Sequence, residues 1–124
     1  MSLLPRALNI IVMADDHAQV HGALSLAAAA AALGRPVRMF FQGVAVRALA
    51  EHRNWADDSA LEAEGAPTIS DLLTQCSELQ VPVSACETGL HVTGIGAAGL
   101  RPGIETEGLI AFLAHQSDAE LVTV

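Results

Sequence analysis

The sequence predicts an α/β fold, a three-layer α/β/α sandwich with a mostly parallel sheet of about five strands, formed by a single domain over residues 1–124. One observation predicts the fold class, and a second indicates that the chain can fold as a single domain. Short apolar runs alternate along the chain with longer segments of helical character, which is typical of parallel strands joined by right-handed helical crossovers. A chain of 124 residues can also bury roughly two-thirds of its unfolded surface, so it needs no disulfide or metal to fold.

The first half of the chain is predicted to contain two buried strands and a long helix. A continuous apolar run over residues 7–14 predicts a central strand. An alanine-rich helix is expected over residues 17–33, and a second apolar strand over residues 37–41. Residues 44–52 have a weak helical pattern, and the acidic segment 54–67 predicts an exposed loop or lid.

The clearest helical pattern follows this acidic segment. Thr68 and Asp71 have the spacing of a capping box at a helix start. The apolar residues that follow share one helical face: Ile69, Leu72, Leu73, Cys76 and Leu79. The pattern therefore predicts a helix that packs on the sheet through this stripe.

The last third of the chain is predicted to add two strands. Residues 81–85 form an apolar strand, and residues 119–124 form the last one. Between them, the glycine-rich segment 86–103 is expected to hold a short helix and an irregular strand near residues 90–95. Residues 105–115 are expected to form the last helix, with acids in its first turn.

The charge of the chain excludes some classes of partner. The net charge is −8 and lysine is absent, so a nucleic-acid backbone or an anionic membrane would be repelled, whereas a basic protein would be attracted. No apolar stretch reaches the roughly 18 residues that cross a membrane. Because Pro5 and Arg6 interrupt the N-terminal apolar run, we interpret it as the first strand and not as a signal peptide. A cytoplasmic location, with reduced thiols, is expected.

Candidate site residues follow from the position of the strands. In parallel sheets, ligands and chemistry collect beyond the carboxyl ends of the strands, and here those ends carry Asp15, Gln42 and Cys86. Cys86 is the candidate reactive group, because free backbone amides at a helix start stabilise a thiolate. Glu87 and His91 are nearby candidates to support it. The alternative is a buried core cysteine.

Other motifs give weaker signals. Cys76 is predicted to fill the core because it lies on an apolar helical stripe, and the alternative is a resolving cysteine for Cys86. His17 and His21 are four positions apart, but they lack the glutamate of the specific zinc motif, so no metal is expected. The GxGxxG pattern at residues 94–99 comes too late in the chain for a dinucleotide fingerprint, so no cofactor is expected.

Three segments in this order resemble the DsrE/DsrF/TusD family of sulfur-relay proteins, which have the YchN-like fold: ALNIIVMADD, LGRPVRMFFQGVAV and LQVPVSACETGL. The resemblance implies that Cys86 carries sulfane sulfur as a persulfide between donor and acceptor proteins, as a sulfurtransferase or persulfide carrier. It also implies assembly into a homo-oligomer, such as a trimer or hexamer. The alternative is a non-catalytic binding or assembly subunit with a small-ligand cleft at the strand ends.

Overall fold

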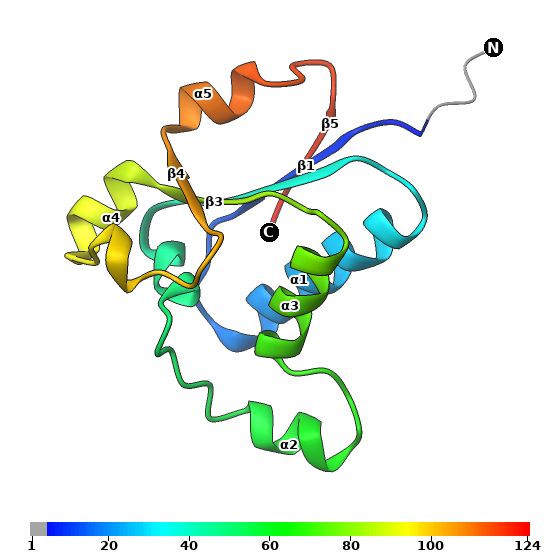
Figure 1. Cartoon of the computed structure of the whole chain (residues 1–124), viewed down its shortest axis with the longest axis vertical. Coiled ribbons are helices and arrows are strands. Elements are labelled where there is room, and N and C mark those ends of the chain that lie inside the picture. Colours follow the sequence, from blue (N-terminus) through cyan, green and yellow to red (C-terminus); the bar gives the residue numbers. More distant parts are fainter. Residues whose placement is uncertain (1–4) are drawn as a thin grey trace.

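Five strands form one sheet in the computed structural model, which describes residues 5–124. The strands are β1 (Leu8–Val12), β2 (Val37–Phe41), β3 (Val83–Cys86), β4 (Glu105–Glu107) and β5 (Glu120–Thr123). Their order in the sheet is β4-β3-β2-β1-β5, and every pairing is parallel (Figure 1). The predicted fold class is therefore confirmed. Residues 1–4 of the expected N-terminal strand lie outside the described residues.

Helices connect these strands. The α-helices are α1 (His17–Ala32), α2 (Asp58–Ala63), α3 (Ile69–Glu78), α4 (Glu87–Thr93) and α5 (Leu109–Ala114), and the 3-10 helices are η1 (Gly43–Leu49) and η2 (Ala97–Gly99). In Figure 1, α1 and α3 lie together on one side of the sheet and α5 lies on the other. Within residues 5–124, no helix is both long and apolar enough to cross a membrane.

The centre of the sheet is apolar on both faces because helices cover both of them. β1 is buried along its whole length, as a central parallel strand should be. Ile10 of β1 pairs with Met39 of β2, which pairs with Val83 of β3. Since side chains alternate between the faces of a strand, Met39 and Phe41 point to one face and Phe40 points to the other.

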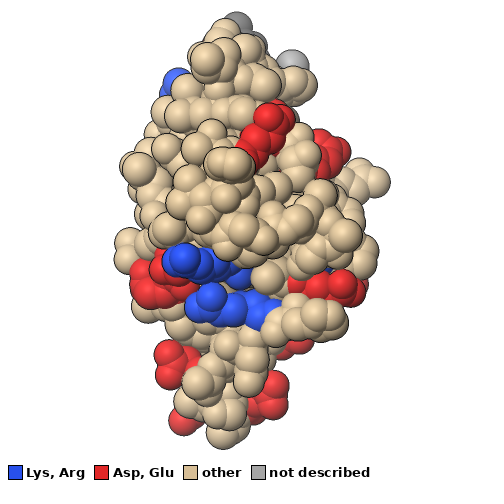
Figure 2. Space-filling view, turned by 90° about the vertical axis from the view of Figure 1, so that its left-hand side faces the viewer, with Lys and Arg blue, Asp and Glu red and all other residues tan. Residues whose placement is uncertain are grey.

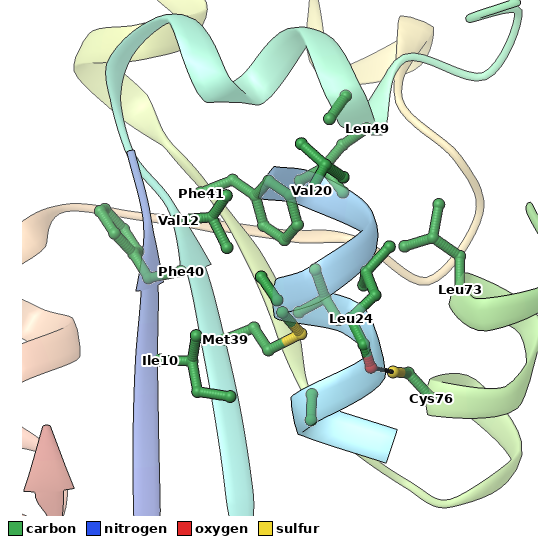
Figure 3. Packing of buried hydrophobic residues seen from close by; sticks show 14 of the residues in the cluster. Ile10, Val12, Val20, Leu24, Met39, Phe40, Phe41, Leu49, Leu73 and Cys76 are labelled. Atoms are coloured by element: carbon green, nitrogen blue, oxygen red, sulfur yellow. Dashed lines mark hydrogen bonds between the residues drawn. The ribbon is translucent and has the colours of Figure 1, made fainter. Parts of the chain in front are cut away.

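The face covered by α1 and α3 contains most of the core. Val20 and Leu24 of α1 pack against Met39 and Phe41 of β2 (Figure 3). The alanines of α1 bring the helix backbone close to the sheet, because their side chains are small. The capping box at Thr68, predicted from the sequence, is present at the start of α3.

The opposite face is covered more thinly. Phe112 is the buried residue of α5, and its ring centroid lies 5.1 Å from that of Phe40. Three large apolar side chains on this helix and on the neighbouring edge strand remain exposed: Ile110, Leu113 and Leu121. A short helix over a broad sheet therefore leaves apolar surface uncovered.

Two sequence predictions for the last third of the chain are wrong. The irregular strand expected near residues 90–95 is absent, because α4 continues to Thr93 and ends at Gly94 with a left-handed φ of 73°. The helix expected over residues 105–115 begins only at Leu109, because the three residues of β4 pair with β3 instead. This pairing joins residues far apart in the sequence, so it overrides the local helical preference.

Two further segments are more regular than predicted. The weak helical pattern at residues 44–52 corresponds to the 3-10 helix η1. The acidic segment 54–67, expected to be an exposed loop or lid, contains the helix α2 and is fixed to α1. His17 of α1 contacts Asp58 at 2.8 Å, and Nε2 of His21 lies 2.9 Å from the carbonyl oxygen of Pro67.

Burial of Cys76 makes the stability of the protein depend on alkaline pH. This thiol is fully buried, and burial raises its pKa from 9.0 to about 11. The unfolded chain loses the proton at lower pH than the folded protein does, so the free energy of unfolding should fall as the pH rises above about 9. At about pH 10.5 the expected loss is about 2 kcal/mol. Urea unfolding of wild type and Cys76→Ala at about pH 8 and 10.5 measures it.

The Cys76→Ala variant also controls for the other titrating groups, because they change the stability of both proteins equally between the two pH values. Cys76→Ala should be less stable at about pH 8 because it leaves a cavity, but its loss between the two pH values should be smaller than that of wild type by about 2 kcal/mol. The same loss in both proteins would show that this thiol does not cause it.

Candidate functional site

Cys86 lies at the point where β3 ends and α4 begins. It is the last residue of the strand and the N-cap of the helix, with φ −65° and ψ 123°. Its Sγ accepts a hydrogen bond of 3.3 Å from the backbone N–H of Gly89. The sequence predicted that this thiol follows the strand directly. In the structure, Cys86 is the last residue of β3 itself. An N–H donor directed at sulfur stabilises negative charge there.

Gly89 allows α4 to pack on η1. A Cβ at this position would collide with the carbonyl oxygen of Gly43 and would lie 2.9 Å from Cγ1 of Val46. Gly43 itself has φ 58°, a left-handed conformation that favours glycine. These two glycines bring α4 against η1, and this contact holds the first turn of α4, including the donor to Sγ, in place.

The Cys86 side chain is largely covered. Only 6% of the surface of Cys86 is exposed, whereas the next two residues, Glu87 and Thr88, are largely exposed. The thiol therefore lies just beneath the surface at the carboxyl edge of the sheet. A reagent reaches it only when the start of α4 or a neighbouring side chain moves.

A polar network beside Cys86 was not predicted from the sequence. β4 pairs Glu107 with Cys86 in register, and the Glu107 carboxylate accepts a hydrogen bond from the Ser84 hydroxyl. Arg38 of β2 reaches the same carboxylate at 3.5 Å and donates to the carbonyl oxygen of Phe112 at 3.1 Å. The sequence feature that could have indicated this network is Arg38, a charged residue in an otherwise apolar strand.

The other strand-end residues lie at the same edge of the sheet, as predicted. Asp15 follows β1 and pairs with Arg47 of η1 at 3.6 Å. Gln42 follows β2, and its backbone N–H donates to the carbonyl oxygen of Val12 at 2.9 Å. Among residues 5–124, neither Asp15 nor Gln42 makes a hydrogen bond with Cys86.

The two candidates on α4 point into solvent. Glu87 and His91 are both exposed, and His91 lies in the last turn of the helix. In the described part of the chain, neither forms a hydrogen bond with Sγ of Cys86. The Gly89 backbone amide, and not a side chain of α4, is the group that contacts the thiol.

The histidine pair of α1 is used in packing. His17 stacks on His21, with ring centroids 5.8 Å apart, and lies edge-on to Trp55 at 5.7 Å. Trp55 is buried within the chain, beneath the Arg53 guanidinium. Among the described residues, no three His, Cys, Asp or Glu side chains are grouped to hold a metal ion.

Cys76 lies on the other side of the sheet from the Cys86 thiol. It packs between α3 and α1, where its Sγ lies 3.9 Å from the carbonyl oxygen of Leu24 (Figure 3). Cys86 follows Ser84 by two positions, so both side chains point to the face of Phe40 and α5. Both cysteines are free. The core interpretation of Cys76 therefore fits the structure, and a resolving role finds no support.

Comparisons with known proteins agree with the fold. The model of the DsrE/DsrF-like family matches residues 7–124. The YchN protein from E. coli has a similar structure with a TM-score of 0.79 and 20% sequence identity, and the match covers 96% of this chain and 99% of that one. None of the curated proteins compared with the sequence gives a significant match.

Two proteins described as being of unknown function have similar structures. MTH1491 from Methanobacterium thermoautotrophicum has a TM-score of 0.65 at 18% identity, with 96% of this chain and 99% of that chain covered. BT1422 from Bacteroides thetaiotaomicron has a TM-score of 0.67 at 12% identity, with 96% and 95% covered. At sequence identities this low, the similarity between these proteins and this chain is a similarity of fold.

The close contact at Gly89 gives a testable prediction. Gly89→Ala should lower the free energy of unfolding by about 1–3 kcal/mol, because the new Cβ forces α4 away from η1. Alkylation of Cys86 in the folded protein should also become faster. Gly22→Ala is the matched control, since a Cβ there meets nothing within 4 Å and alanine favours the helix. Urea unfolding and alkylation rates followed by mass spectrometry measure both effects, and equal behaviour of the two variants would contradict the prediction.

Proposed function

Because the chain belongs to the DsrE/DsrF-like family, we propose that it is a cytoplasmic sulfur carrier that holds sulfane sulfur as a persulfide on Cys86 and passes it from a donor protein to an acceptor protein. The observation that carries this proposal is the position of the thiol. It lies at the carboxyl edge of a parallel sheet, where such folds place their chemistry, and it accepts an N–H hydrogen bond.

The transfer uses two exchange steps. The Cys86 thiolate, formed by loss of its proton to water, attacks the outer sulfur of a donor persulfide R–S–SH. A new bond forms between Sγ and that sulfur, the donor S–S bond breaks, and R–S⁻ leaves and takes up a proton. An acceptor thiolate then attacks the outer sulfur of Cys86–S–SH, and Cys86 leaves as the thiolate. Neither step changes the overall number of electrons, so neither needs a redox cofactor.

The Gly89 amide supports both steps. Sγ carries negative charge when it attacks the donor and again when it leaves from the persulfide. The same N–H, at 3.3 Å, stabilises that charge in each case. Asp15, Gln42, Glu87 and His91 stay candidates to contact the incoming partner, because they lie around the strand ends and on the exposed side of α4.

Burial of the thiol fits a carrier that protects its cargo. At 6% exposure, Cys86 is shielded from unrelated thiols, whose thiolates would attack and remove the outer sulfur. A partner that displaces the start of α4 would open the site. The net charge of −8 would attract a basic partner.

We further propose that the chain forms a homo-oligomer, such as a trimer or hexamer, through the thinly covered face of the sheet. Ile110 is 86% exposed, and Leu113 and Leu121 are also exposed on this side. Apolar side chains gathered in this way favour a protein interface. The same observation supports a second candidate function, that of a non-catalytic assembly subunit in which Cys86 only caps α4.

Intact mass after incubation with a sulfane-sulfur donor tests the carrier function. Wild type should gain about 32 Da for each bound sulfur atom, and a reductant should remove the gain. Cys76→Ser should still gain the mass because its thiol is in the core, whereas Cys86→Ser should not. No gain in folded wild type, or a gain that persists in Cys86→Ser, would favour the assembly subunit instead.

Light scattering tests the proposed interface. Ile110→Asp introduces a charge into the apolar surface of α5 and should shift the assembly toward single chains, because a desolvated charge at an interface is costly. Leu33→Asp is the matched control, since Leu33 is 81% exposed at the end of α1, away from α5. A monomeric wild type, or equal masses for wild type and Ile110→Asp, would refute the interface.

A further inference from the structure

A polar cavity lies beside the acidic segment, away from the contact between Cys86 and α4. Its volume is about 250 Å³, and its walls come from the end of η1, the segment that carries α2, the start of α3 and the loop that contains Arg101. Drug-sized ligands occupy cavities of roughly 300–1,000 Å³, so this one suits a smaller molecule. Its polar walls favour recognition through charge and hydrogen bonds.

Two guanidinium groups line this cavity without a carboxylate partner. Among residues 5–124, Arg53 and Arg101 have no carboxylate oxygen within 4.0 Å, although Arg35, Arg38 and Arg47 all do. In so acidic a chain, this arrangement is unexpected. Figure 2 shows a face on which basic side chains gather in a hollow with acidic side chains beside them.

Both arginines are held in position by neutral groups. The Arg53 guanidinium lies over the Trp55 ring, 4.1 Å from its centroid, and donates to the carbonyl oxygen of Asp15 at 3.4 Å. Arg101 Nη1 lies 3.5 Å from the Ser70 hydroxyl. Among residues 5–124, the other N–H groups of each guanidinium make no hydrogen bond, and their geometry matches that of a carboxylate.

The cavity also carries negative charge. Asp58 is already engaged, because its carboxylate contacts His17 and accepts from the N–H of Ile69 at 3.4 Å. Glu51 and Glu62 are exposed in the wall and have no cationic partner within 4.0 Å among the described residues. A simple anion would satisfy the arginines but would be repelled by these two carboxylates.

We propose that this cavity binds a small zwitterion of the α-amino acid class. The ligand carboxylate would be held by Arg53 and Arg101, and its ammonium group by Glu51 or Glu62. The site is separate from the persulfide chemistry at Cys86, so Cys86→Ser should bind the same ligand equally well. Failure of either proposal therefore leaves the other intact.

Trp55 provides the measurement, because it is the only tryptophan of the chain and lines the cavity. Its fluorescence is followed during titration with L-alanine and L-glutamine. Propionate and ethylamine are the matched probes, since they lack the ammonium and the carboxylate of alanine, and inorganic phosphate tests for an unspecific anion site. We expect a saturable change with an amino acid, and binding weaker by on the order of tenfold for propionate and ethylamine.

Two substitutions test the assigned contacts. Arg101→Gln should weaken amino-acid binding by on the order of tenfold, as should Glu62→Gln if its carboxylate holds the ammonium group. Arg6→Gln and Glu64→Gln, which change charges outside the cavity, are the matched controls and should leave binding unchanged. Thermal unfolding curves establish that each variant is folded.

Three results would overturn the proposal. The first is the absence of any saturable change with either amino acid in folded wild type. The second is binding that Arg101→Gln and Arg6→Gln affect equally. The third is binding of phosphate or propionate as tight as that of the amino acid, which would show an anion site only.

Discussion

The position of the Cys86 thiol depends on the contact between two stretches of backbone, the carbonyl of Gly43 and the Cα of Gly89. Any side chain at position 89 would occupy the space of that carbonyl. The contact sets the start of α4 against η1, so the Gly89 N–H points at Sγ. A site built from backbone has few side chains to recognise in a sequence, and its orientation does not depend on flexible rotamers.

The face of the sheet that carries α5, to which the Cys86 side chain points, is organised by a half-buried cation. Arg38 points from β2 toward α5, where it stacks 4.4 Å from the Phe112 centroid and reaches the carboxylate of Glu107. Asn9, its register partner on β1, has a buried Oδ1 with no hydrogen-bond partner among the described residues. An unpaired buried oxygen is unfavourable. Together with the exposed apolar residues of α5, it supports the interface that we propose for this face.

The segments predicted well from the sequence are those whose structure follows from local pattern. The apolar runs of β1 and β2, the alanine-rich α1 and the capping box at Thr68 each carry their signal within a few residues. β4 does not, because its three residues, Glu105, Thr106 and Glu107, have no strand pattern and are held by pairing with β3. The Cys86 position was predictable for the same reason as β3, but the partners of the thiol were not. The Gly89 amide reaches Sγ through the first turn of α4, and Glu107 is brought beside Cys86 by the nonlocal pairing of β4 with β3.

Burial of Cys86 places two requirements in opposition. In the proposed carrier function, a persulfide lasts longer when unrelated thiols are kept away, whereas transfer requires that the outer sulfur meet a partner thiolate in line. The exposed Glu87 and Thr88 follow the covered thiol directly in the chain, in the first turn of α4. That turn contains Gly89, whose contact with Gly43 holds the closed position. A partner that binds the exposed side of α4 and weakens this contact would expose the sulfur only when an acceptor is present, which couples recognition to transfer.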